Sequence, residues 1–200
     1  FLQPVRISIM QYVIPDIVKK SRSIRRFDES RRIPEDILVE LVDIARFCPS
    51  ARNRQPLRYV IASSPGDTAR IRSCVLWALD LPKWDGPAIG ERPTGYIIIV
   101  TEQDCIPNPC TDIGIAAQTM MLAAAERGFG GCMMGSILKK ELREVLGIPG
   151  EYEIHLVLAF GYPAEKVIID PIPEDGNTRY WRDSHDVHHV PKRSFGNVLI

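Results

Sequence analysis

Three polar segments of the sequence carry residue types that could bind a phosphorylated or heterocyclic ligand. The first runs from Ser21 to Phe27 and contains Arg22, Ser23 and Arg25. An arginine can hold a phosphate through two parallel hydrogen bonds, and a neighbouring hydroxyl can add another. Taken alone, the segment is more typical of a basic turn in solvent, because charged runs usually lie on the surface.

The second segment is bracketed by two prolines, Pro49 and Pro56. Within it, Asn53 and Gln55 each offer a hydrogen-bond donor and an acceptor, which suits the imide-like edge of a heterocycle. By itself such a stretch is more often a capped loop, since asparagine and proline favour loops for conformational reasons.

The third segment is rich in glycine and extends from Gly128 to Gly135. Glycines would allow the backbone to approach a flat ring closely. The spacing differs from the G-x-G-x-x-G pattern that follows a strand in dinucleotide-binding folds. Without other information, a tight turn from a helix into a strand is the simpler interpretation, with Met133 and Met134 as core filler.

Alternating helices and strands are expected to position these segments. Periodic apolar residues and turn signals predict helices at 34–48, 65–79, 112–127 and 139–146 and strands at 57–62, 95–101, 131–134 and 153–160. The run at 95–101 is almost continuously apolar, so we expect it to be covered on both faces. Residues 82–93 carry many prolines and glycines and are expected to form an irregular loop.

The last part of the chain changes in composition after Pro163. Prolines, charged residues and histidines argue against a long regular element between 164 and 200. Ordering such a tail costs conformational entropy that burial must offset. We therefore expect a single domain over 1–200, with a core at about 15–163 and an arm that wraps a partner subunit.

Composition excludes several classes of function. Lys plus Arg and Asp plus Glu each total 25, so the net charge does not steer the protein toward nucleic acid or an anionic membrane. None of the apolar runs approaches the ~20 residues that a membrane helix requires. The stretch from Phe1 to Val13 lacks the pattern of a secretion signal. Five cysteines without a CxxC spacing indicate neither a disulfide framework nor a zinc site, and a cytoplasmic location fits best.

In combination, the segments resemble the FMN-dependent nitroreductase family, over roughly residues 15–200. Members typically have an arginine-serine-x-arginine start, a P-S-A-x-N-x-Q-P loop, a D-x-G-x-A-x-Q helix and a G-F-G-x-C stretch. The corresponding residues here are Arg22–Arg25, Pro49–Pro56, Asp112–Gln118 and Gly128–Gly135, with similar residues at Gly161–Pro163 and Val190–Ser194. The chain departs from the family at Ser21, where many members have a basic residue, and at Leu57, which is often aromatic.

The resemblance implies an α+β fold in three α/β/α layers, with a central mixed, mostly antiparallel sheet flanked by helices. It also implies a homodimer that exchanges its extended C-terminal arms and binds FMN at the subunit interface. The implied activity is ping-pong transfer of electrons from NAD(P)H through FMN to a nitroaromatic, a quinone or a similar small oxidant.

The resemblance also implies roles for individual residues. Arg22, Ser23 and Arg25 would hold the FMN phosphate, the ribityl chain or the nearby ring edge, and Lys192 and Arg193 would close on the phosphate from the tail. Arg25 is the candidate for the cation beside the ring.

The remaining implied contacts come from the other two segments. Asn53 would bond the polar edge of the ring, and backbone groups of 133–135 would approach N5. The second segment would contribute from the partner chain, where Ser50 and Ala51 would lie against the ring. The residues of these two segments in the expected site are Pro49, Ser50, Ala51, Asn53, Gln55, Met133, Met134 and Gly135.

We expect no dedicated catalytic side chain and no metal. His185, His188 and His189 lack a matching ligand spacing, so a solvated or phosphate-facing role is expected for them. Cys132 lies in an apolar run and is expected to be buried and unreactive. The Asp112 helix is expected to pack in the dimer rather than supply an acid catalyst.

Alternatives stay open at this point. The same flavin site could serve dehalogenation, flavin fragmentation or dehydrogenation of a ring, or the protein could be a carrier that binds FMN without turnover. RNA binding is disfavoured, because the basic segments lack interleaved aromatic residues.

Overall fold

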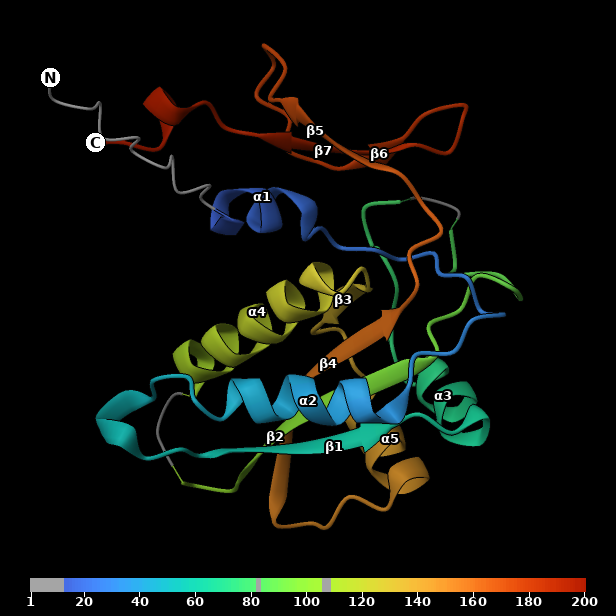
Figure 1. The fold of residues 1–200 in the computed structure, drawn as a ribbon, viewed down its shortest axis with the longest axis vertical. Helices are drawn as coiled ribbons and strands as arrows, with labels where there is room; N and C mark the ends of the chain where they lie inside the picture. Colours follow the sequence, from blue (N-terminus) through green and yellow to red (C-terminus); the bar gives the residue numbers. More distant parts are fainter. Residues whose placement is uncertain (1–12, 82–83, 106–108) are drawn as a thin grey trace, which may run out of the picture.

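The computed structural model describes residues 13–81, 84–105 and 109–200. The N-terminal residues on which we judged the absence of a secretion signal lie, apart from Val13, outside this part. A four-stranded sheet forms the centre of the fold (Figure 1). In spatial order its strands are β1 (Leu57–Ala62), β2 (Gly95–Glu102), β4 (Tyr152–Gly161) and β3 (Gly130–Met134).

The central sheet is antiparallel at each of these three strand pairings. A parallel contact is added at its edge, where Ser23 bridges Gly131 of β3. The expected mixed, mostly antiparallel sheet is therefore confirmed, and its parallel component comes from the first polar segment.

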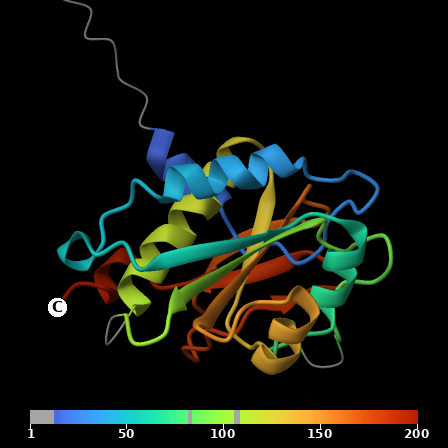
Figure 2. The ribbon, with the colours of Figure 1, turned by 90° about the horizontal axis from the view of Figure 1, so that it is seen from below.

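Helices cover both faces of this sheet, which gives the three expected layers (Figure 2). The helices are α1 (Val13–Lys20), α2 (Glu35–Ala45), α3 (Pro65–Arg72), α4 (Cys110–Glu126) and α5 (Lys139–Leu146). In β2, Ile97 and Ile99 pack in the cluster that includes α2 and α4, and Ile98 packs in the cluster with α3 and α5. Successive residues of a strand point to opposite faces, so β2 is buried on both sides, as predicted.

The small residues of α4 allow close packing within the chain itself. Ala116, Ala117 and Ala124 are buried in the same cluster as Leu38 and Leu41 of α2. The alanines therefore serve packing within the chain, and dimer packing of this helix stays a prediction. The α4 residues that are exposed or half-buried, and so face outward, include Gly114, Ile115, Gln118 and Leu122.

One predicted helix is shorter than expected. The helix that begins at Pro65 ends at Arg72, and the prediction that it reaches Leu79 is wrong. The chain turns there to pair with another segment, because Val75 bridges Ile137 and the N–H of Leu76 donates to the carbonyl of Ser136 at 3.0 Å. Tertiary pairing thus overrides a local helical pattern.

The C-terminal part forms a second sheet, which the sequence did not predict. It contains β5 (Val167–Pro171), β7 (His188–Lys192) and β6 (Trp181–Arg182) in that spatial order, and a 3₁₀ turn, Phe195–Asn197, follows. β5 runs parallel to β7, and β6 runs antiparallel to it. The strands are short, and two of the prolines that argued against a long element lie within them: Pro171 ends β5, and Pro191 is inside β7. Exchange of the arm at 164–200 with a second subunit stays a prediction.

Among the described helices, none has the length and apolar character needed to cross a membrane.

Candidate functional site

The segment that carries Arg22, Ser23 and Arg25 is fixed along the edge of the central sheet. The N–H of Ile24 donates to the carbonyl of Gly131 at 2.8 Å, next to the bridge between Ser23 and Gly131. Ile24 and Phe27 are buried and anchor the segment in the hydrophobic core. Ser23 is left exposed and Arg25 half-buried, so the polar side chains lie on the accessible side.

Arg25 contacts neutral groups of the C-terminal sheet region. Its Nη1 lies 3.2 Å from Nε2 of His188, and its guanidinium lies 4.6 Å from the centre of the Tyr180 ring. Because arginine only donates, His188 must accept through Nε2 and carry its proton on Nδ1. Burial, and then the charge of Arg25, lower the pKa of His188 to about 4, which keeps this imidazole neutral.

Arg22 lies beside two further basic residues, Lys19 and Lys20. Its guanidinium donates to the carbonyl of Val18 at 2.7 Å, and its Nε is buried without a partner. Lys19, Lys20 and Arg22 line a pocket of about 280 Å³ whose opposite wall is formed by residues 128–131. This pocket offers positive charge and a glycine-rich wall together.

The loop from Pro49 to Pro56 holds an unusual backbone conformation. Arg52, Asn53 and Gln55 have φ values of 53°, 55° and 50°, a left-handed region that non-glycine residues enter at a cost. The loop is held by its own polar groups, since Ser50 Oγ accepts the N–H of Gln55 at 3.0 Å. Such strain persists only where the surroundings enforce it, and it is frequent at functional sites.

Asp112, near the start of α4, holds this loop by a hydrogen bond. Asp112 is 4% exposed, and its carboxylate accepts the N–H of Ala51 at 3.2 Å. The expectation that Asp112 is no acid catalyst fits this structural bond. The Asp112 contact also orients Ala51 and Ser50, the two residues expected to lie against a ring.

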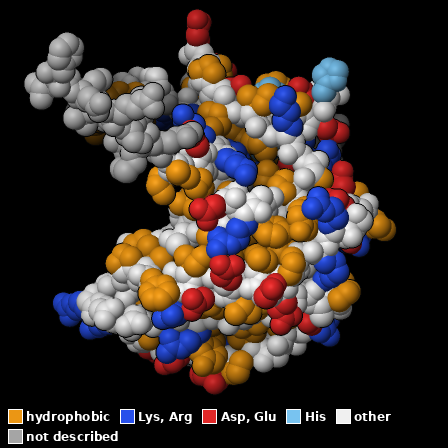
Figure 3. Space-filling view, viewed as in Figure 1, with side chains coloured by type: hydrophobic (Ala, Val, Ile, Leu, Met, Phe, Trp, Pro, Cys, Tyr) orange, Lys and Arg blue, Asp and Glu red, His pale blue; other side chains and the backbone are white. Residues whose placement is uncertain are grey.

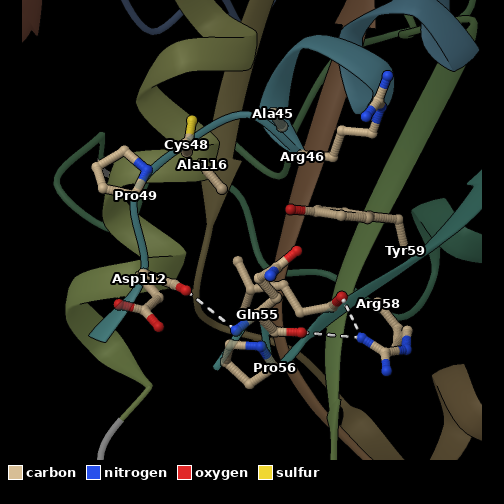
Figure 4. A pocket seen from close by; sticks show the side chains of 12 residues that line it. Ala45, Arg46, Cys48, Pro49, Gln55, Pro56, Arg58, Tyr59, Asp112 and Ala116 are labelled. Carbon is tan, nitrogen blue, oxygen red and sulfur yellow. Dashed lines mark hydrogen bonds between the residues drawn. The ribbon is translucent and has the colours of Figure 1, made fainter. Parts of the chain in front are cut away.

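A pocket of about 190 Å³ lies between this loop and β1 (Figure 4). The ring of Tyr59 extends into it from β1, and Cys48 lines it near Ala116. Burial, and then the neighbouring Cys48, raise the pKa of Tyr59 to about 12. Tyr59 is therefore a neutral phenol that can donate and accept hydrogen bonds.

The two groups of expected site residues lie apart within one chain. Ser21 donates to the carbonyl of Met121 near the end of α4, whereas Ala51 is bonded to Asp112 near its beginning. Nine residues of helix separate these points, which corresponds to about 14 Å along the axis. The molecular surface is hollowed where α4 lies between α1 and the loop (Figure 3).

The glycine-rich segment has mixed roles. A Cβ on Gly131 would lie 2.8 Å from the carbonyl oxygen of Ala159, and one on Gly130 would lie 2.8 Å from Ile24. These two glycines are therefore needed for packing of the chain itself. Gly135 has open space around it, and it remains available for a close approach by a ligand.

The basic residues near the end of the chain are exposed. Lys192 ends β7 and pairs with Pro171, and Arg193 follows it. Among the described residues, neither side chain forms an ion pair, and neither is bonded to Arg22 or Ser23. Closure of this pair on a phosphate stays a prediction.

The interpretation of the histidines needs correction. His188 is 1% exposed and touches Arg25, so it is not solvated, and the phosphate-facing alternative stays a prediction. His185 is exposed. His189 bonds Asp170 at 2.6 Å, which raises its pKa. The described part of the chain holds no cluster of side chains suited to a metal ion.

Cys132 is buried, as expected, and burial raises the pKa of its thiol. Four residues near Arg25 were not anticipated as a group: Glu165, Tyr180, Arg182 and His188. Only the nearness of Glu165 to the family-like Gly161–Pro163 stretch could have indicated one of them.

Comparisons with known proteins identify the family of this chain. The model of the nitroreductase family matches residues 18–162. The chain belongs to the nitroreductase family.

Two curated relatives have similar sequences. An iodotyrosine deiodinase of Thermotoga neapolitana is 26% identical over 165 residues, which cover 74% of this chain and 87% of the relative. A Bacillus subtilis protein named for an inferred NAD(P)H nitroreductase activity, YfhC, is 25% identical over 168 residues, with coverages of 76% and 86%.

Solved structures share the fold of this nitroreductase-family chain. A protein of Desulfovibrio desulfuricans crystallised with FMN superposes with a TM-score of 0.66 at 16% identity and covers 95% of this chain and 96% of its own. An FMN-dependent nitroreductase of Clostridium difficile gives a TM-score of 0.61 at 21% identity, with coverages of 75% and 87%.

Proposed function

We propose that this protein is an FMN-dependent oxidoreductase that works as a homodimer. It would pass electrons from NADH or NADPH to a nitroaromatic, a quinone or a similar small oxidant. The observation that carries the proposal is Arg25, a half-buried cation fixed beside β3 and touched by neutral side chains. A single domain and a cytoplasmic location belong to the same proposal.

The residues present fit an FMN molecule. Arg22 Nε and His188 Nδ1 are two of the buried donors without a hydrogen-bond partner among the described residues, and both belong to the first polar segment or contact it. Arg22, Lys19 and Lys20 supply charge for a phosphate, and the open backbone at Gly135 admits a flat ring.

One subunit would hold most of the cofactor. Arg22, Ser23 and Arg25 would bind the phosphate, the ribityl chain and the ring edge, with Lys192 and Arg193 closing from the arm. Backbone groups of residues 133–135 would lie at the ring. FMN supplies the electron-transfer chemistry when it is bound, while the protein supplies position and charge.

The second subunit would complete the site through the loop from Pro49 to Pro56. Each pocket, at about 280 and 190 Å³, is smaller than the ~300–1,000 Å³ of typical ligand sites. Since the two halves lie about 14 Å apart along α4, a two-fold partner could bring its loop to the other chain's Arg25 side. The apolar side chains that such an interface could cover include the exposed Val13, Ile14, Phe195, Val198 and Leu199.

The chain's own residues would act by charge and orientation. Arg25 would place a positive charge beside the pyrimidine edge of the ring, which favours negative charge there in the manner of an oxyanion site. From the partner, Asn53 and Gln55 offer amides to the polar edge. A dedicated acid or base is not needed for this role, so we assign none.

The first experiment is an absorbance spectrum of the purified protein, followed by anaerobic addition of NADH and then NADPH. We expect flavin bands that bleach with one nucleotide and return with a nitroaromatic or a quinone. Colourless protein that cannot be loaded with FMN would refute the proposal. Full loading without reduction by either nucleotide would favour a non-catalytic carrier.

Oligomeric state tests the shared site independently. Sedimentation of the FMN-loaded protein should show a dimer, and dilution should release subunits and FMN together. A stable monomer that keeps its flavin would contradict a site built from two chains.

Reductive dehalogenation is the second candidate, because the relative from Thermotoga neapolitana is named as an iodotyrosine deiodinase. Release of iodide from iodotyrosine by the reduced protein, at a rate above that of nitroaromatic reduction, would favour it.

A further inference from the structure

A buried carboxylate, that of Glu165, fixes the backbone of the segment that carries Arg25. The Glu165 side chain is 1% exposed. One of its oxygens accepts the N–H of Arg25 in a short contact and the N–H of Arg26 at 3.2 Å. The neighbouring N–H of Ala164 donates to the carbonyl of Arg26 at 2.9 Å. Glu165 therefore sets where Arg25 leaves the backbone.

The charge of Glu165 is matched by Arg182 of β6. Arg182 Nη2 donates to the second carboxylate oxygen at 2.8 Å, and the Arg182 side chain is 9% exposed. The guanidinium also lies 4.5 Å from the centre of the Trp84 ring, which holds it from another side. A buried carboxylate requires such a partner, because removing an ion from water is costly.

Arg25 has no such partner within the described chain. The groups around its guanidinium are the imidazole of His188, the ring of Tyr180, the carbonyl of Ser23 and the thiol of Cys132. Burial raises the pKa of the Cys132 thiol, so all four groups are uncharged. Burial and the charge of Arg25 hold the pKa of His188 low, so this neighbour stays neutral. The nearest buried negative charge, on Glu165, faces the backbone and Arg182 instead.

We propose that Arg182 and Glu165 form a charge-matched pair of positioning residues that keeps the full positive charge of Arg25 available to the flavin. Glu165 orients Arg25 through its backbone, and Arg182 cancels the negative charge that this requires. The inference rests on the proposed function, because it assumes that Arg25 faces FMN. It assigns a role in tuning the flavin to the C-terminal sheet.

The arrangement predicts opposite effects for the two members of the pair. Glu165→Gln keeps an oxygen that can accept the two N–H groups but leaves Arg182 unmatched, so net positive charge rises near Arg25. Arg182→Met leaves the carboxylate unmatched, so net charge becomes more negative. Positive charge favours reduced FMN, which is the more negative form.

The measurement is the midpoint potential of bound FMN, together with the dissociation constants of oxidised and reduced FMN, in the full-length dimer. We expect Glu165→Gln to raise the ratio of oxidised to reduced dissociation constants about tenfold, equivalent to about 30 mV for two electrons. Arg182→Met should lower the ratio by a similar factor. The double variant should return to within about threefold of the wild type.

Glu91→Gln is a matched control. Glu91 pairs at 3.3 Å with Arg26, which neighbours Arg25 on the first polar segment. The Glu91 side chain is 37% exposed, so solvent screens its charge. We expect the Glu91→Gln ratio to stay at the wild-type value. If Arg182→Met does not fold, the test is whether the ratio of oxidised to reduced dissociation constants is higher in Glu165→Gln than in Glu91→Gln.

The outcomes separate the two proposals. Wild-type protein that does not bind FMN refutes the proposed function. Wild-type protein that binds FMN, with single variants that shift the potential in the same direction or not at all, refutes only the charge-matched pair. Opposite shifts that cancel in the double variant support it, because loss of structure alone would not produce opposite signs.

Discussion

Replacing Gly131 by alanine should destabilise the protein and detach the segment that carries Ser23. A Cβ at this position would lie 2.8 Å from the carbonyl oxygen of Ala159, 2.9 Å from Met121 Sδ and 3.0 Å from the Phe160 ring. The first of these is backbone in the adjacent strand β4 and cannot move without disturbing the sheet. Gly131 also accepts the N–H of Ile24, so any shift is transmitted to the Ser23 segment.

The size of the effect follows from these contacts. Overpacking by one methyl group in a well-packed interior typically costs about 1–3 kcal/mol. For a protein of this length, each kcal/mol lowers the melting temperature by about 2–4 °C. We therefore expect Gly131→Ala to melt roughly 2–12 °C below the wild type and to bind FMN more weakly.

Gly135→Ala is the matched control, because nothing lies within 4 Å of the new Cβ. Its melting temperature without FMN should equal or slightly exceed that of the wild type, since alanine restricts the unfolded chain. FMN affinity should nevertheless fall if the backbone at Gly135 approaches the ring. Thermal melts of apoprotein and FMN titrations measure both quantities. A Gly131→Ala protein as stable as Gly135→Ala would refute the packing argument.

Two further predictions concern the loop and the buried histidine. Asp112→Ala should lower the free energy of unfolding by about 1.5–3 kcal/mol and speed hydrogen exchange at the Ala51 amide, because a bond to a buried carboxylate is lost. Asp112→Asn keeps an acceptor and should lose less stability. Equal exchange rates at Ala51 in both variants and the wild type would contradict this prediction. His188 has a folded pKa of about 4 against 6.5 for the free side chain, so its contribution to stability is fully present above pH 6.5 and falls by roughly 2–3 kcal/mol as the pH drops to 4. Urea unfolding should show that the free energy of unfolding falls less between pH 7 and pH 4 for His188→Gln than for the wild type. Identical pH profiles would rule out this role of His188. Asp170 raises the pKa of His189, so His189 changes stability with pH in the opposite direction. Because His189 is present in both proteins, its effect cancels when His188→Gln is compared with the wild type.

Local sequence determined most of the elements of the core. The apolar run at 95–101 became the doubly buried strand β2, and the helix predicted at 139–146 is α5, which ends at Gly147 with φ of 64°. These features depend on residue periodicity and on glycine's backbone freedom, both of which are local properties. The prediction that the helix continues beyond Arg72 was wrong, because Val75 pairs with Ile137, a partner far along the chain.

The sequence also identified the three polar segments and, through their order, the family. It could not decide how they are arranged, because the positions of the segments depend on packing against α4 and β3. The structure shows that two of the expected glycines, Gly130 and Gly131, serve the chain's own packing. It also shows that the Pro49–Pro56 loop and Ser21 contact different ends of α4.

Only the tertiary structure revealed the surroundings of Arg25. Glu165, Tyr180, Arg182 and His188 come from a tail whose composition suggested irregular chain, and no local pattern links them to a residue about 140–160 positions earlier. Burial and charge matching are properties of atoms brought together by folding, so the sequence alone could name the cation but not what keeps it unpaired.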